Sequence, residues 1–110
     1  MISSPLLTTI PDLIHSFGTR DDDLPVEVVT SEQVHGTEIL FVKDRPTIQP
    51  SGFDILMTDR PGLAVGVRTA DCLPILIADP KRRLVAAVHA GWKGTLKRVV
   101  EVAIRRMKEI

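Results

Sequence analysis

The chain has 110 residues, of which 44% are hydrophobic and 25% are charged, a length and composition typical of one folded domain. Fourteen Lys and Arg residues balance fourteen Asp and Glu residues, so no net positive charge favours a nucleic acid polymer or an anionic membrane as partner. Because no apolar run approaches the roughly 20 residues of a membrane-spanning helix, and the N-terminus does not resemble a secretory signal, we expect a cytoplasmic protein.

The N-terminal part of the chain is predicted to alternate short strands with polar loops. Its first residues are rich in Pro, Ser, Thr and Asp, which indicates a short strand near 13–17 and then a loop. β-branched and apolar residues predict strands over 26–30 and 38–42, on either side of the segment Ser-Glu-Gln-Val-His35-Gly. A further strand is predicted over 54–58, between turn signals. His35 is therefore expected at or beside a strand end.

The middle of the chain predicts an antiparallel pair of strands. Two apolar pieces, 63–68 and 73–78, surround a polar junction, and the strand over 84–89 follows 73–78 after a turn rich in polar residues. If the pairing register centres on that turn, Cys72 and His89 lie at the same open end of the pair.

The C-terminal residues predict an amphipathic helix that begins near Thr95, which can cap it. No internal repeat or linker divides the chain, so residues 1–110 are interpreted as a single domain. The helix is expected to bury one apolar stripe against a sheet: Leu96, Val100, Ala103 and Met107.

Two histidines and the single cysteine are the candidate metal ligands. A catalytic zinc ion usually has three protein ligands, drawn from His, Cys and carboxylates, and one open position. His35, Cys72 and His89 fit that count, and each stands beside a Gly, an Asp or another strand-ending signal. Asp71 is a candidate to orient a ligating histidine or to accept a proton. The alternative reading is structural: satisfied histidines, a small buried cysteine and a hydrogen-bonding Asp at a strand end.

Three segments, taken in order, resemble the signature motifs of the laccase-domain family, also called multicopper polyphenol oxidase-like or peptidoglycan editing factor-like proteins. They are Ser-Glu-Gln-Val-His35-Gly, Thr69-Ala-Asp-Cys72-Leu-Pro and Ala87-Val-His89-Ala-Gly-Trp92-Lys-Gly. The segment from Phe53-Asp54 to Thr58 is similar as well. The resemblance implies a layered α+β sandwich with mixed β-sheets. It also implies that His35, Cys72 and His89 form the catalytic metal site, with zinc, or alternatively copper, as the metal.

The resemblance further implies an enzyme that cleaves purine nucleosides with phosphate and deaminates adenosine. Its substrates would be phosphate and nucleosides such as adenosine, inosine, guanosine and methylthioadenosine. Multicopper oxidation is harder to support, because it needs many histidine ligands and the chain has three histidines. The remaining site candidates adjoin the signature-like segments: Arg20, Arg68 and Lys93 could hold phosphate, and Trp92 either lines a purine pocket or fills the core.

Family members are more than twice as long as this chain, and the resemblance covers about the first half of the family pattern. The single laccase-like domain over 1–110 is therefore expected to be incomplete at its C-terminus. The isolated chain is expected to expose apolar surface and to self-associate.

Two alternatives remain open on the residues alone. A thiol hydrolase would use Cys72 as nucleophile and His89 or His35 as base, without a metal, with an amide bond of a peptidoglycan precursor as substrate. A non-catalytic module would use the same three residues to hold a structural metal. The sequence leaves the oligomeric state and the preferred purine open.

Overall fold

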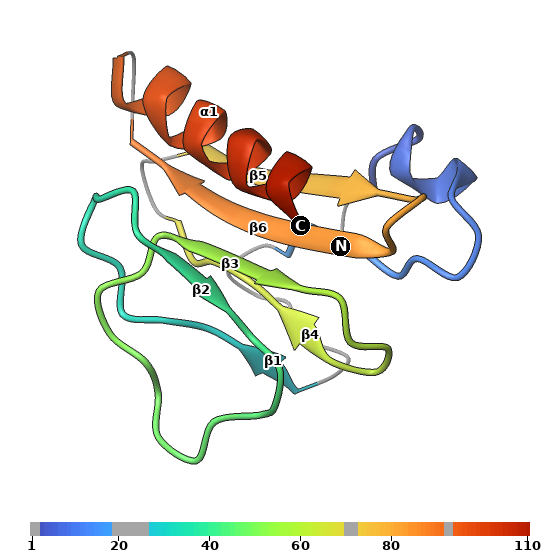
Figure 1. Cartoon of the computed structure of the whole chain (residues 1–110), viewed down its shortest axis with the longest axis horizontal. Helices are drawn as coiled ribbons and strands as arrows, with labels where there is room; N and C mark the ends of the chain where they lie inside the picture. Colours follow the sequence, from blue (N-terminus) through green and yellow to red (C-terminus); the bar gives the residue numbers. More distant parts are fainter. Residues whose placement is uncertain (1–2, 19–26, 70–72, 92–93) are drawn as a thin grey trace.

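The computed structural model describes residues 3–18, 27–69, 73–91 and 94–110 (Figure 1). A four-stranded sheet in the order β2-β3-β6-β5 forms its centre, and a two-stranded parallel sheet, β1-β4, lies beside it. The elements are η1 (Leu7–Thr9), β1 (Val28–Val29), β2 (Ile39–Phe41), β3 (Ile55–Thr58), β4 (Ala64–Val65), β5 (Leu73–Asp79), β6 (Leu84–Ala90) and α1 (Gly94–Glu109). Strands β2 and β3 are parallel, whereas β6 is antiparallel to both β3 and β5, so the sheet is mixed.

The central sheet is covered differently on its two faces. Helix α1 packs on one face, as Figure 1 shows above β6 and β5, and the small sheet β1-β4 packs on the other. Val99, Ala103 and Met107 of the helix are buried against side chains of β3 and β6. Val29 and Leu56 form a second apolar cluster on the opposite face. This arrangement confirms the predicted layered α+β sandwich with mixed sheets.

The predicted antiparallel pair is confirmed as the hairpin β5–β6. Its register pairs Asp79 with Leu84 at the turn and Leu73 with Ala90 at the open end. Pro74 stands opposite His89 on β5, an edge strand, where a residue without an N–H group is tolerated. His89 is therefore fixed at the end of the hairpin where the register argument placed it.

Strand alternation decides which face of the sheet His89 occupies. Val88 and Ala90 belong to the cluster under α1, so His89 between them points to the opposite face. Ile55 belongs to the same cluster, which places the preceding residue, Asp54, on the face of His89 as well. Because Ile55 pairs with Val88, the next pair along the ladder is Asp54 and His89.

The structure differs from three local predictions. Residues 13–17 form no strand, and only Phe17 makes an isolated bridge. Pro11 and Asp12, whose φ is +64°, make a turn, and the ring of His15 accepts a hydrogen bond from the Ser4 N–H. Of the helix residues expected to be buried, Ala103 and Met107 are buried, and Val100 is partly buried against the same cluster, where Val99 is fully buried. The side chain of Leu96 lies outside the described part of the chain. The helix also begins at Gly94, one residue before the predicted start.

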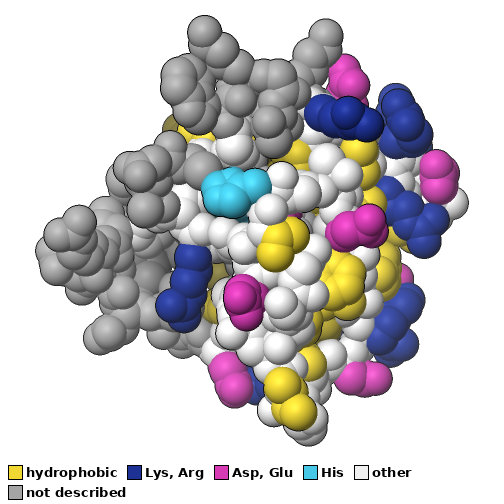
Figure 2. Space-filling view, turned by 90° about the vertical axis from the view of Figure 1, so that its left-hand side faces the viewer, with side chains coloured by type: hydrophobic (Ala, Val, Ile, Leu, Met, Phe, Trp, Pro, Cys, Tyr) yellow, Lys and Arg dark blue, Asp and Glu magenta, His cyan; other side chains and the backbone are white. Residues whose placement is uncertain are grey.

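Within the described residues, no helix combines the length and the apolar character that crossing a bilayer requires. The charges are mixed in sign as well. On the face shown in Figure 2, acidic and basic side chains of the described residues are interspersed around exposed apolar ones.

Candidate metal centre

A buried carboxylate and a buried imidazole form the centre of the site. Asp54 is fully buried, and His89 is 4% exposed. The Nδ1 atom of His89 lies 2.6 Å from Oδ2 of Asp54, and the His89 backbone N–H donates to the Asp54 carbonyl oxygen at 2.8 Å. Backbone and side chain of His89 are thus both held by one residue.

The same carboxylate holds the loop that carries His35. The backbone N–H groups of Val34 and Gly36 donate to Oδ1 of Asp54 at 2.9 and 3.2 Å, and that of His35 donates to Oδ2 at 3.0 Å. The loop needs such support because His35 has a φ of +60°, a left-handed conformation that costs most L-residues free energy.

The hydrogen bonds determine the charge of Asp54. Burial by itself raises the pKa of the Asp54 carboxyl, but hydrogen bonds from the Val34 N–H, the His89 ring and the N–H groups of Gly36 and His35 outweigh burial. The net pKa lies below its ordinary value of 3.8, so the carboxylate is ionised at neutral pH and only accepts hydrogen bonds. The proton of the hydrogen bond therefore belongs to Nδ1 of His89, which leaves Nε2 as the ring atom that could bind a metal.

The two imidazoles lie side by side. The ring centroids of His35 and His89 are 5.0 Å apart and the rings meet edge to face at 61°. His35 is exposed whereas His89 is buried. A solvent-exposed imidazole therefore contacts an imidazole that is held in the interior. Such a pair places the ring nitrogens of two imidazoles at the border between protein and solvent.

A second contact joins the His35 loop to the segment that follows β4. The side-chain amide of Gln33 accepts a hydrogen bond from the Arg68 N–H at 2.8 Å and donates one to the Arg68 carbonyl oxygen at 2.7 Å. This two-point contact holds the backbone of Arg68 beside the His35 loop, four residues before Cys72 in the sequence.

The structure brings His35 and His89 together and holds the backbone of Arg68 next to their loop. The other predicted site residues lie outside the described part of the chain: Arg20, Asp71, Cys72, Trp92 and Lys93. Strand β5 begins one residue after Cys72, at the end of the hairpin where His89 stands. Within the described residues alone, no three His, Cys, Asp or Glu side chains are grouped to hold a metal ion.

Asp54 and Gln33 are the site residues that the sequence argument missed. Asp54 had two signals, its place directly before the apolar run of β3 and the family resemblance of the segment from Phe53-Asp54 to Thr58, but neither assigned it a role. The role of Asp54 can be inferred only when β3 is known to pair with β6, because its partner His89 lies 35 positions away in the sequence. Gln33 carried no signal beyond its place in the His35 motif.

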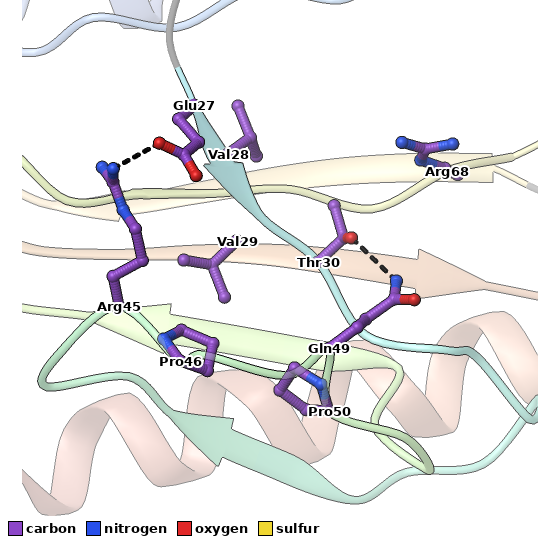
Figure 3. Close-up of a pocket in the computed structure, with 9 residues that line it drawn as sticks. All are labelled: Glu27, Val28, Val29, Thr30, Arg45, Pro46, Gln49, Pro50 and Arg68. Carbon is purple, nitrogen blue, oxygen red and sulfur yellow. Dashed lines mark hydrogen bonds and ion pairs between the residues drawn. The ribbon is translucent and has the colours of Figure 1, made fainter.

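A cavity among the described residues lies elsewhere. It has a volume of about 310 Å³ and opens between β1 and the loop over 45–50, where Arg45 pairs with Glu27 and Gln49 donates to Thr30 (Figure 3). Arg68 lines it, but neither His35 nor His89 does. The cavity is therefore separate from the pair of imidazoles.

The left-handed backbone conformation of His35 predicts which substitutions this position tolerates best. Among variants that lack the imidazole, His35→Gly is expected to be more stable than His35→Ala by about 1 kcal/mol, because glycine adopts positive φ without the Cβ penalty. Urea unfolding of the two variants measures the difference. As a control, the same comparison at Gly36, whose φ is not positive, should favour the alanine or leave stability unchanged. A His35→Ala variant more stable than His35→Gly would contradict the assigned backbone.

Comparison with known proteins identifies the family. The family model described as multi-copper polyphenol oxidoreductase laccase matches residues 17–110. The chain belongs to this family.

Curated relatives in the laccase family include enzymes of purine metabolism. A purine nucleoside phosphorylase of Bacteroides thetaiotaomicron is 36% identical over 94 residues, which are 78% of this chain and 35% of the relative. A purine nucleoside phosphorylase of Clostridium acetobutylicum is 48% identical over 79 residues, 71% of this chain and 32% of the relative. An adenosine deaminase of an unknown prokaryotic organism is 32% identical over 103 residues, 86% of this chain and 38% of the relative.

Solved structures agree with this assignment. The hypothetical protein YfiH of Bacillus licheniformis superposes with a TM-score of 0.59 at 33% identity, covering 74% of this chain and 35% of that one. YlmD of Geobacillus stearothermophilus gives a TM-score of 0.57 at 35% identity, covering 66% and 29%. The chain thus spans about a third of the length of its laccase-family relatives, less than the half expected from the sequence motifs.

The donor set of this laccase-family chain fits one metal ion. His89 donates Nδ1–H to a carboxylate, which is the usual arrangement of a histidine that binds a metal through Nε2, and His35 supplies a second imidazole beside it. The third histidine of the chain, His15, already accepts a hydrogen bond from Ser4. With two histidines at the site and the third bonded to Ser4, the chain does not supply the histidine ligands that several copper ions need.

Proposed function

We propose that this chain carries the metal site of a purine nucleoside phosphorylase that also deaminates adenosine, with zinc held by His35, Cys72 and His89. The observation that carries the proposal is the hydrogen-bonded pair Asp54–His89, which fixes a buried imidazole whose centroid lies 5.0 Å from that of His35. A carboxylate behind a histidine in this way is typical of catalytic metal sites. Two imidazoles and one thiolate leave the fourth position open for substrate or water.

The proposed roles of the residues follow from their chemistry. Zinc, when bound, supplies Lewis acidity that lets water act as a nucleophile near neutral pH. His35, His89 and the Cys72 thiolate hold it, and Asp54 keeps the His89 ring in one orientation. Arg68, Arg20 and Lys93 are the proposed cations for phosphate. Asp71 is the proposed proton acceptor, and Trp92 is proposed to stack on the purine.

Two reactions can then use one site. In phosphorolysis a phosphate oxygen bonds to the anomeric carbon of the ribose while the bond from that carbon to the purine nitrogen breaks, and the base leaves with a proton. In deamination water adds to the purine carbon that bears the amino group, and ammonia leaves. The names of the relatives support both reactions, since they include purine nucleoside phosphorylases and an adenosine deaminase.

One incubation distinguishes these reactions. The purified protein is mixed with adenosine, with and without phosphate, and adenine, inosine and hypoxanthine are separated. Adenine that forms only with phosphate indicates phosphorolysis, and inosine without phosphate indicates deamination. Both products are expected to disappear after chelation and to return with added zinc. Turnover that is unchanged in a protein free of metal would contradict the proposal.

The thiol hydrolase is the second candidate, because an imidazole oriented by a carboxylate is also the arrangement that activates a cysteine nucleophile. It predicts a different response to reagents. Chelation would leave its rate unchanged, whereas iodoacetamide would inactivate it in proportion to the Cys72 modified. The same preparation therefore tests both functions.

A further inference from the structure

Asp54 contacts both histidines of the proposed site, each by a different route. It receives the ring N–H of His89, and it receives the backbone N–H of His35 together with those of the two neighbouring residues. We infer that Asp54 is the positioning residue that sets the orientation of both imidazole ligands at once, so that metal affinity depends on this carboxylate. The inference rests on the proposed function.

The first argument is the balance of donors and acceptors. Four N–H groups converge on the two carboxylate oxygens, two on each, at distances from 2.6 to 3.2 Å. Asp54 is fully buried, so the protein and not solvent must satisfy it. Only a carboxylate accepts from four donors without presenting a donor of its own.

The second argument concerns how each ligand is fixed. For His89 the contact is with the ring itself: a carboxylate only accepts, so Nδ1 must donate, and Nε2 is the ring atom left to bind a metal. For His35 the contact is with the backbone on both sides of a residue at φ +60°, which sets the point from which its side chain starts. Removing one carboxylate would therefore disturb two ligands that lie 54 positions apart in the sequence.

The substitution Asp54→Asn tests this role because it keeps size and shape. An amide has one oxygen and one NH₂ group, so two of the four N–H groups lose their acceptor whichever way it turns. With NH₂ toward His89, the ring must accept on Nδ1 and carry its proton on Nε2, the atom that a metal needs. With the amide oxygen toward His89, the N–H groups of Val34 and Gly36 lose their acceptor, so the His35 loop is held by fewer hydrogen bonds.

Ser31 provides a matched control at the same junction. Its hydroxyl is buried, accepts from the Phe53 N–H at 3.2 Å and donates to the Glu32 carbonyl oxygen at 3.1 Å. It thus anchors the start of the same loop beside Asp54, but it contacts neither His35 nor His89. Ser31→Ala is expected to lower stability without changing metal affinity.

The experiment measures zinc affinity by competition with a chromophoric chelator, for the parent, Asp54→Asn and Ser31→Ala. Asp54→Asn is expected to bind zinc about 10–100-fold more weakly than the parent, whereas Ser31→Ala keeps the affinity of the parent. Equal affinities of the parent and Asp54→Asn would overturn the inference. So would an equal loss in Ser31→Ala, because that result would reduce Asp54 to a general anchor of the loop.

A second measurement remains decisive if Asp54→Asn does not fold. In the parent without metal, ¹⁵N NMR of the imidazoles, assigned with His15→Ala and His35→Ala, is expected to show His89 protonated on Nδ1. A neutral ring protonated on Nε2 would overturn the inference. A parent that binds no zinc would overturn the proposed function together with this inference, whereas zinc binding without nucleoside turnover would contradict the proposed activity alone.

Discussion

Removing any one of the three proposed metal ligands is expected to abolish nucleoside turnover and to lower bound zinc almost as far as removing all three. His35→Ala, His89→Ala and Cys72→Ser each leave two protein ligands, and residues that act as one unit are strongly non-additive. Zinc by elemental analysis and turnover of adenosine, before and after chelation, measure the effect. Added zinc should restore the chelated parent but none of the three variants.

The third histidine of the chain gives the control for this series. His15 accepts a hydrogen bond from the Ser4 N–H and is far in sequence from the proposed site, so His15→Ala should keep zinc and turnover. If the losses of zinc and turnover in the three single variants added up to the loss in the triple variant, the three residues would not act as ligands of one shared metal ion. An inactive Cys72→Ser variant beside a parent that works fully without metal would favour the thiol hydrolase.

The second large effect is expected in the core under α1. Val99 is fully buried against the central sheet, so Val99→Asp would place an unpaired charge there and lower the free energy of unfolding by about 3 kcal/mol or more. Urea unfolding followed by circular dichroism measures the change. Val100→Asp should cost less, because Val100 is only half-buried.

Ile104→Asp separates burial from helix propensity. Ile104 lies on the same helix and is 40% exposed, so the substitution brings the same change in helix propensity without burying a charge. It should lower the free energy of unfolding by about 1 kcal/mol or less. If Val99→Asp were no more harmful than Ile104→Asp, the assigned packing face of α1 would be wrong.

Local sequence patterns were sufficient for the hairpin, the helix and the position of His89. Two apolar runs separated by a polar turn predict a pairing centred on that turn, and the structure has this register, with Leu73 opposite Ala90. The helical spacing of apolar residues likewise predicts α1. It did not decide between Val99 and Val100, since adjacent residues lie about 100° apart around the helix and both can belong to an apolar stripe of that width.

The organisation of the site depends on contacts that no local pattern contains. His35 and His89 were expected together because of a family resemblance, and their meeting requires β3 to lie beside β6, antiparallel, with Asp54 opposite His89. Strand order in a sheet is decided by packing over the whole chain. The sequence around Asp54 therefore indicates that a charged residue begins a buried strand, but it does not indicate that His89 is the partner of this residue. The hydrogen bonds between Asp54 and the His35 loop, and between Gln33 and Arg68, join segments 18 to 35 positions apart and exist only once these layers have assembled.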